Sequence, residues 1–260
     1  LAAAEQALLI EPDSAEALLA TAGYMEYGCR LAEAVKMYEK IIEVSPNDPT
    51  AHHWLALIWN YTGSTGKAKE EIDIAHALDP LITAVIGVQG EIEMAKGNYE
   101  EARELHQRAA SMGFYGGNLF DEGYVALHQG DFAAAKMLMS QGRTGDDEEL
   151  IEEVRLFFAA LEDPAKRPEF HEYIGTAGEK VTFPELDTVM LLAASNDPYL
   201  FEYLAEADCP PVVDDLWAAG FREQRGKPEF LDLMKRAGAV ELWEQRGWPD
   251  DCESVYGCPE

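Results

Sequence analysis

The six histidines of this chain are the side chains best suited to general acid–base or metal chemistry, because imidazole titrates near neutral pH. His52 and His53 are adjacent, so on a helix they point in different directions and cannot share a metal ion. The sequence contains no GxSxG nucleophile elbow, no phosphate loop ending in GK[ST] and no GxGxxG motif after a strand. We therefore expect a protein that is not an enzyme and that carries no cofactor.

A run of acidic residues from Asp146 to Glu149, followed by Glu152 and Glu153, offers the carboxylate oxygens that hard cations prefer. No tight oxygen-rich loop accompanies the run. The other interpretation is a solvated helix face whose acids favour the positive N-terminal end of that helix. We prefer this second interpretation and expect no metal site.

The four cysteines could form disulfides or bind zinc. Cys29 lies at the end of a predicted helix and Cys209 precedes a Pro-Pro pair, so we expect both to be free thiols. Cys252 and Cys258 lie in a short tail with Gly257 and can close a disulfide in an oxidising compartment. Free thiols are the alternative for this pair. Zinc fits poorly because no histidine or CxxC pair is near.

Three prolines at equal intervals, Pro12, Pro46 and Pro80, indicate the elements that position these side chains. Small residues recur in phase with them. They are Ala22, Ala56, Gly90 and Gly123 at one place, and Ala34, Ala68, Ala102 and Ala135 at another. Small side chains let two helices of one unit pack closely, and Gly63, Gly97 and Gly130 are suited to end the first helix of a unit. The pattern predicts stacked helix pairs.

Residues 1–143 resemble tetratricopeptide repeats, with one truncated repeat followed by four more. The resemblance implies an all-α fold, a right-handed superhelix (α-solenoid) of helix pairs, A and B. The chain departs from the repeat pattern at His52, which replaces the usual tryptophan, and in the fourth full unit, which lacks the closing proline. Because the chain begins inside a unit, we expect it to be a piece of a longer protein.

The resemblance also implies that helix A of each unit lines the hollow side. We call the residues at these places the inner wall: Leu19, Ala20, Glu26, Tyr27, His53, Trp54, Leu57, Asn60, Tyr61, Val88, Glu91, Met94, Phe120, Asp121, Tyr124 and His128. The inner wall contains no Lys or Arg, so we expect a protein or peptide partner with hydrophobic anchors and some basic residues. Alternatively, the protein's own C-terminal helices or a second subunit of a homodimer cover it.

Residues 144–260 are expected to form degenerate helix pairs and a C-terminal cap. One helix is predicted from Asp146 or Asp147 through about Leu161. Further helices are predicted near 168–177, 185–194, 198–207, 211–219, 228–237 and 239–246. The last 45 residues or so resemble the C-terminal end of tetratricopeptide regions in bacterial signalling proteins, which follow a winged-helix DNA-binding domain or a nucleotide cyclase domain. Five aromatic residues there can also plug the open end of the solenoid: Trp217, Phe221, Phe230, Trp243 and Trp248.

The net charge of −29 and the lack of a basic stripe exclude direct nucleic-acid binding, and no run of 18 apolar residues is present. We expect a noncatalytic protein–protein interaction module, the sensing or scaffold region of a bacterial signalling or transcription regulator. The alternative is a stand-alone adaptor or chaperone for assembly or secretion of client proteins. The partner's identity, the oligomeric state and the preceding domain stay open. So does the compartment, with the cytoplasm preferred to the periplasm.

Overall fold

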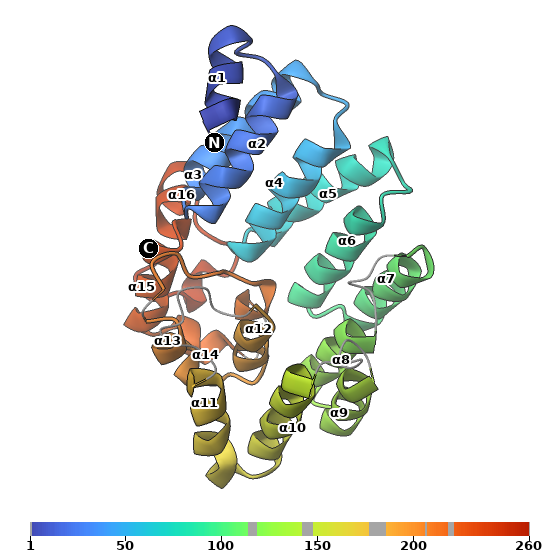
Figure 1. Cartoon of the computed structure of the whole chain (residues 1–260), viewed down its shortest axis with the longest axis vertical. Helices are drawn as coiled ribbons and strands as arrows, with labels where there is room; N and C mark the ends of the chain where they lie inside the picture. Colours follow the sequence, from blue (N-terminus) through green and yellow to red (C-terminus); the bar gives the residue numbers. More distant parts are fainter. Residues whose placement is uncertain are drawn as a thin grey trace.

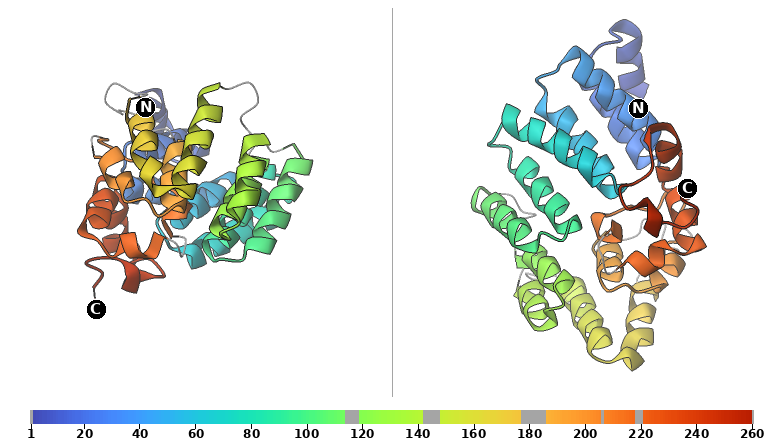
Figure 2. Two further views of the ribbon diagram at one scale, coloured as in Figure 1. Left: turned by 90° about the horizontal axis from the view of Figure 1, so that it is seen from below. Right: turned by 180° about the vertical axis from the view of Figure 1, so that it is seen from behind.

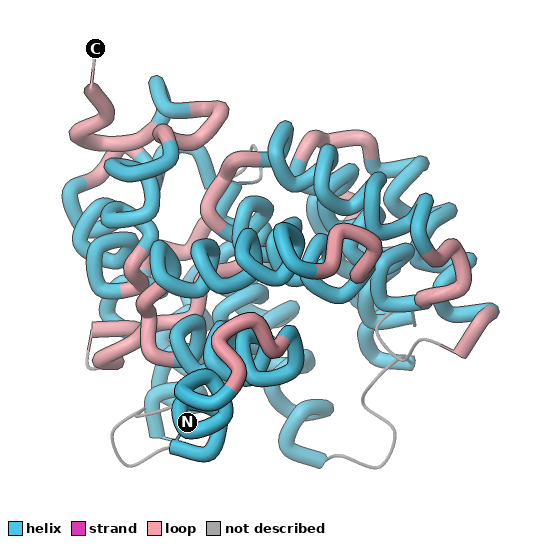
Figure 3. Tube along the Cα trace, turned by 90° about the horizontal axis from the view of Figure 1, so that it is seen from above, coloured by secondary structure: helices cyan, strands magenta, loops and turns pink. Residues whose placement is uncertain are grey.

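The computed structural model describes residues 2–113, 119–141, 148–176, 186–205, 207–217 and 221–259, and all regular structure within these ranges is helical (Figure 3). A first helix, α1 (Ala2–Ile10), is followed by four antiparallel pairs. The pairs are α2 (Ala15–Tyr27) with α3 (Leu31–Val44), α4 (Pro49–Tyr61) with α5 (Thr65–Leu78), α6 (Thr83–Ala95) with α7 (Tyr99–Ser111), and α8 (Leu119–His128) with α9 (Phe132–Gln141). We call α1–α9 the repeat half. Its pairs confirm the predicted all-α solenoid of stacked helix pairs.

Local signals in the sequence fix where these helices begin and end. The Asp48 carboxylate accepts a hydrogen bond from the backbone N–H of Thr50 at 2.8 Å, and Pro49 occupies the first turn, where its missing N–H costs nothing. The turn after helix A contains a left-handed glycine in three units, Gly63, Gly97 and Gly130. In the first full unit Cys29 takes this conformation instead, with φ 55°.

Small residues at the phased places let the two helices of each pair approach closely. Ala34, Ala68, Ala102 and Ala135 are all completely buried. A β-carbon added at Gly90 would lie 2.8 Å from Cε1 of His106, so this unit needs glycine where the first two have alanine. His52 and His106 are both buried, as expected of core residues. The phasing predicted from the sequence is therefore confirmed.

The C-terminal half, residues 148–259, is built from one 15-residue helix and a series of shorter elements. They are α10 (Glu148–Glu162), η1 (Pro164–Lys166), α11 (Arg167–Thr176), α12 (Leu186–Ala194), α13 (Tyr199–Tyr203), η2 (Asp214–Trp217), α14 (Arg222–Arg225), α15 (Pro228–Arg236), α16 (Ala239–Arg246) and η4 (Cys252–Ser254). α10 packs against both α9 and α11, so the row of helices continues across residue 143, where a domain boundary stays a prediction.

Two helix predictions for this half were wrong in extent. The helix expected over 198–207 extends only from Tyr199 to Tyr203. The carbonyl groups of Leu204 and Ala207, which follow this helix, accept hydrogen bonds from the Arg236 guanidinium at 2.9 and 2.8 Å. These bonds replace the hydrogen bonds that a longer helix would make. Within the described part of the helix expected over 211–219, residues 211–217, the regular structure is the 3-10 turn η2, and residues 218 and 219 lie outside the described ranges. Residues 211–213, which precede η2, have no regular structure.

The helices α1 to α10 follow an arc, and the chain then turns back so that α12–α16 lie on the inside of that arc (Figures 1 and 2). α16 packs against α3, η2 packs against α4 and α6, and α12 packs against α8. Helices α4, α6 and α8 are all helix A of their units. In the second, third and fourth full units the A helix therefore faces the C-terminal half, whereas in the first full unit α16 packs against the B helix, α3.

A buried arginine, Arg225, forms hydrogen bonds that join η2 to the last residues of the chain. The Arg225 side chain is 1% exposed, and its guanidinium donates to Oγ of Ser254 at 2.8 Å, to the carbonyl of Leu216 at 2.8 Å and to the Asp251 carboxylate at 3.0 Å. It also lies over the Trp217 ring, 5.5 Å from the ring centroid. Burial lowers the pKa of Arg225, and the Asp251 carboxylate opposes this shift.

Candidate protein-binding wall

The inner wall is divided into an exposed part and a covered part. Tyr27 is 90% exposed and Trp54 is 37% exposed, whereas Asn60 is fully buried. The wall residues Leu57, Val88, Met94 and Tyr124 are also buried. The side chains of Phe120 and Asp121 lie outside the described residues. The sequence left open whether the inner wall is exposed or covered. In the structure it is exposed on α2 and the first part of α4, and it is enclosed over the remaining part.

Near the open part, His53 behaves as an apolar aromatic. Its ring lies 5.2 Å from that of Trp54 in an edge-to-face arrangement. Burial lowers the pKa of His53 to about 4, so the ring is neutral at neutral pH. Leu19 packs partly buried against the core beside this surface. His53, Trp54 and Tyr27 together offer aromatic area without a positive charge.

Carboxylates lie close to this surface. Glu16 is exposed on α2 and precedes Ala20 and Tyr27 by 4 and 11 residues, so the three share one helix face. Burial raises the pKa of Glu26, and a hydrogen bond from the Tyr38 hydroxyl at 3.2 Å opposes this shift. Glu91, Tyr61 and His128 are half-buried wall residues, and the His128 ring is stacked on Tyr99 of α7.

The covered part is held by the turn between α4 and α5, residues 61–67, which we call the α4–α5 turn. The indole N–H of Trp217 donates to the carbonyl of Tyr61 at 2.9 Å, and that of Trp243 donates to the carbonyl of Thr62 at 3.0 Å. These carbonyls end a helix and have no partner in the next turn of that helix. The two tryptophans of the C-terminal half therefore cap α4.

A second set of bonds joins the same turn to the end of the chain. The Asp250 N–H donates to the carbonyl of Gly63 at 3.0 Å, while its carboxylate accepts from the Gly66 N–H at 2.7 Å and the Thr65 hydroxyl at 2.9 Å. Lys67 donates to the carbonyl of Arg246 at 2.6 Å. The α4–α5 turn is thus an attachment site for the C-terminal half.

Sequence reasoning did not find this attachment site. The sequence suggests that the five aromatic residues plug the open end of the solenoid, but Trp217 and Trp243 bind the turn of the second full unit. One signal was present, since a left-handed glycine places no side chain between the turn and an incoming ring. A β-carbon on Gly63 would lie 2.6 Å from the Trp217 indole.

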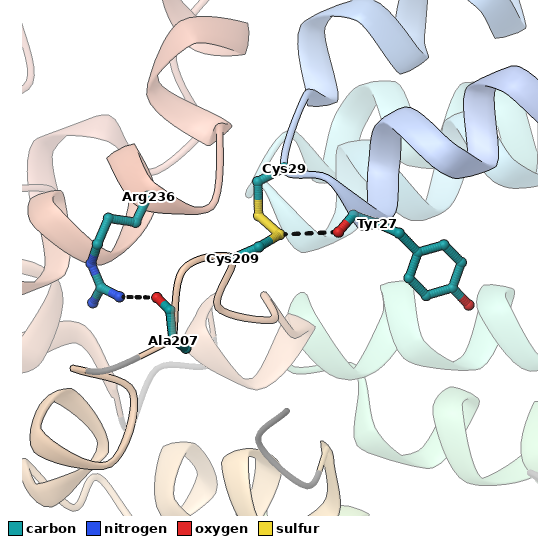
Figure 4. The surroundings of a disulfide bond; sticks show 5 residues. All are labelled: Tyr27, Cys29, Ala207, Cys209 and Arg236. Carbon is teal, nitrogen blue, oxygen red and sulfur yellow. Dashed lines mark hydrogen bonds between the residues drawn. A yellow bond between two sulfur atoms is a disulfide. The ribbon is translucent and has the colours of Figure 1, made fainter. Parts of the chain in front are cut away.

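The cysteine pairing also differs from expectation. Cys29 and Cys209 are not free thiols: they form a disulfide that joins the end of α2 to the segment before η2 (Figure 4). The pairing was missed because 180 residues separate the two cysteines, and only the return of the chain across the arc brings them together. The structure pairs Cys252 with Cys258 as well.

The acidic run shows no metal geometry in the part of it that the structure describes. Glu152 forms a bidentate ion pair with Arg155, and Glu153 accepts a hydrogen bond from Thr188. Asp146 and Asp147 lie outside the described residues. Across the described ranges, no group of three or more histidine, cysteine or acidic side chains could hold a metal ion, and none of the described helices is long and apolar enough to cross a membrane.

Comparison with known proteins identifies no family for this chain. No protein-family model and no curated protein matches the chain. Among 18 matching chains of known structure is one from the structure of Naa15/Naa10 bound to HypK-THB. It has a TM-score of 0.42 and 15% sequence identity, over 93% of this chain and 38% of that chain. This chain therefore spans less than half of that protein, and a similarity of this size identifies no partner or activity.

Proposed function

We propose that this protein is a noncatalytic interaction scaffold that docks a polypeptide on the open part of the inner wall. The observation that carries the proposal is the exposure of Tyr27 and Trp54, whereas the adjoining wall residues, such as Leu57 and Asn60, are buried. Tyrosine and tryptophan dominate binding energy at protein interfaces because they bury a large area and lose few rotatable bonds. A partner that covers Tyr27 and Trp54 gains most from this surface.

The charge of the chain supports a partner with basic residues beside its hydrophobic anchors. The formal net charge is −29, and Glu16 lies on the same face of α2 as Tyr27. Such a field accelerates the approach of a basic segment and disfavours an acidic one. An amphipathic helix or an extended segment with one aromatic or leucine anchor and flanking Lys or Arg fits these requirements.

Two biological settings accommodate this scaffold. In the first, it is the sensing or scaffold region of a bacterial signalling or transcription regulator, a setting supported by the resemblance of its last 45 residues or so. In the second, it is a stand-alone adaptor or chaperone for client proteins. The pairing of all four cysteines favours the second setting, because disulfides persist mainly outside the cytoplasm. A DNA-binding or cyclase domain encoded before Leu1 would select the regulator, and a signal peptide would select the adaptor.

Peptide selection tests the docking surface directly. Random peptides displayed on phage are selected on the folded chain, and the enriched sequences are synthesised and measured by fluorescence anisotropy. We expect peptides with hydrophobic anchors and Lys or Arg. The Tyr27→Ala/Trp54→Ala variant should bind them at least about 30-fold more weakly, as expected when residues worth about 2 kcal/mol are lost.

Leu81→Ala is the matched control, because Leu81 is a large apolar residue, 74% exposed, that lies outside the inner wall. This variant should bind the selected peptides like the unmodified chain. Both variants should keep the circular dichroism spectrum and the melting temperature of the parent. Peptides that bind the double alanine variant as tightly as the parent would exclude the open wall as the docking surface.

A further inference from the structure

The fold brings all four cysteines of the chain together in two pairs. Cys29 and Cys209 have Cα atoms 5.6 Å apart, and Cys252 and Cys258 have Cα atoms 5.7 Å apart, both within the range that a disulfide spans. The first pair is the more informative one, because it joins the repeat half to the C-terminal half. The second pair closes only a short loop in the tail.

The backbone at Cys29 is unfavourable for a residue with a β-carbon. Its φ of 55° lies in the left-handed region, which Gly63, Gly97 and Gly130 occupy after helix A of the following units. A cysteine there costs conformational free energy that glycine does not, because its β-carbon crowds the following carbonyl oxygen. A bond to Cys209 offsets this cost, whereas a free thiol would not.

Both ends of the Cys29–Cys209 bond are held by other contacts. On the repeat side, the turn between α15 and α16 lies directly against Cys29, and a β-carbon added at Gly238 would overlap the Cys29 carbonyl oxygen. On the other side, Arg236 of α15 binds the carbonyl of Ala207, two residues before Cys209 (Figure 4). The bond therefore joins two positioned segments.

We infer that the chain matures in an oxidising compartment, where the Cys29–Cys209 disulfide is a redox-sensitive clasp that fixes the C-terminal half on the repeats. In forming the clasp, the thiolate of one cysteine attacks a sulfur of an exchangeable disulfide oxidant and releases one thiol. The second cysteine then attacks the mixed disulfide and releases the other. The two cysteines lose two electrons and two protons, and the oxidant becomes two thiols. This inference reverses the preference for the cytoplasm drawn from the sequence.

Thiol trapping and thermal unfolding of the full chain test the clasp. After folding in a glutathione redox buffer, the chain is unfolded without reductant and treated with iodoacetamide. We expect no alkylated cysteine, and peptide mapping should give the links Cys29–Cys209 and Cys252–Cys258. Cys209→Ser should lower Tm by roughly 10 °C, because a long closed loop restrains the unfolded chain most. The Cys252→Ser/Cys258→Ser variant closes no short loop and should lose about half as much.

A second variant keeps the test valid if Cys209→Ser folds poorly. Cys29→Gly combined with Cys209→Ser supplies the residue that the other units use at this turn, so it should melt a few degrees above Cys209→Ser alone. Reductant should lower the Tm of the parent more than that of either variant, because both variants lack the Cys29–Cys209 bond and can lose only Cys252–Cys258. Native cells treated with N-ethylmaleimide before lysis should yield protein unlabelled at Cys29 and Cys209. Labelling of these cysteines, other pairings, or an unchanged Tm in Cys209→Ser would overturn the inference.

Discussion

The repeat half and the C-terminal half differ in how their helices are held. In the repeat half, each helix packs against its neighbours in sequence, and the closest contacts are made by alanines such as Ala34 and Ala68. In the C-terminal half, α13 and α14 have five and four residues, and lengths this short are not stable without tertiary contacts. That half relies on buried polar groups and large aromatic rings.

This difference implies two sources of stability. Repeats that contact only their neighbours tolerate local damage, because each interface contributes separately. The C-terminal half depends on a few groups that bring distant segments together, among them Arg225, Trp217 and Trp243. Single substitutions of these groups should therefore have larger effects than equivalent changes among the repeats.

The largest effect is expected at Arg225. Replacing it with alanine leaves a cavity beside Trp217 and removes the donor to the Leu216 carbonyl and the Asp251 carboxylate. Loss of one partner from a buried charged network typically costs about 3–5 kcal/mol. Urea unfolding followed by tryptophan fluorescence should report this loss, because Trp217 and Trp243 both lie in the affected half.

Arg225→Lys is the informative companion. It keeps the charge, but a single ammonium group cannot reproduce the planar fork that reaches Ser254, Leu216 and Asp251 at once. We expect an intermediate loss. If Arg225→Ala unfolded within 1 kcal/mol of the parent, the C-terminal half would not depend on this network, and the contrast between the halves would be wrong.

The next effect compares two glycines with the same backbone. Gly63 and Gly97 have φ values of 80° and 81°, so alanine at either place costs about 1–2 kcal/mol for the left-handed conformation. At Gly97 a new β-carbon meets no atom within 4 Å of it. At Gly63 the new β-carbon would also overlap the Trp217 ring. Displacing a packed ring costs about 1–3 kcal/mol more. Gly63→Ala should therefore be the more destabilising variant by this margin in chemical denaturation.

A double-mutant cycle with Trp217→Ala tests the cause. Once the ring is removed, Gly63→Ala should cost no more than Gly97→Ala, because only the backbone term remains. Equal effects of the two glycine variants in the parent chain would show that Trp217 moves away at no cost. The C-terminal half would then not be fitted closely to the α4–α5 turn.

The repeat half could be predicted from the sequence because its structure is determined locally. The spacing of Pro12, Pro46 and Pro80 and the phased alanines report contacts between residues that are near in sequence. The C-terminal half lacks a period, and its helices were placed from proline positions alone. The failure over 211–217 shows the limit of that signal, since Leu216 and Trp217 are held there by Arg225 and by the carbonyl of Tyr61, which is distant in sequence.

The inner wall was predicted less completely than the fold. Helices α4, α6 and α8 contact the C-terminal half as helix A is expected to do, but the use of the named wall residues for binding stays a prediction. Which part is open depended on where the C-terminal half returns, and this is determined by contacts across more than 150 residues, such as that between Trp217 and Tyr61. No local pattern encodes such a contact. The same reason explains why the partner of Cys29 was missed.

An intermediate effect is expected from acid, and it should arise in the repeat half. Burial lowers the pKa of His106 to about 4, against an ordinary value of 6.5, and within the described part of the chain its Nδ1 has no hydrogen-bond partner. Because the folded state binds the proton more weakly, stability is lost as the pH falls from 6.5 toward 4. At pH 5 the loss is about 2 kcal/mol. Urea unfolding at pH 7 and pH 5 measures it.

His106→Leu is the control for this prediction, since leucine has a similar volume and does not titrate. The variant should lose about 2 kcal/mol less than the parent between pH 7 and pH 5. Using the difference between the two chains removes contributions from other groups, including Glu26, whose pKa is shifted in the opposite direction. If both chains lost the same free energy of unfolding between pH 7 and pH 5, His106 would bind its proton as readily in the folded chain as in the unfolded one.

The smallest effect is expected where the two halves meet in solvent. Arg246 of α16 forms an ion pair with Glu39 of α3, and both side chains are about one-third exposed. Exposed pairs contribute about 0–1 kcal/mol, because water screens them and two long side chains lose freedom. Arg246→Ala should therefore resemble Lys69→Ala, which removes an exposed pair with Asp73 inside the repeat half. Measured by urea unfolding at low and at high salt, the free energy of unfolding of either variant should differ from that of the parent by less than about 1 kcal/mol. If Arg246→Ala alone lost more than about 2 kcal/mol of unfolding free energy, surface charge would join the two halves, rather than the buried rings and Arg225.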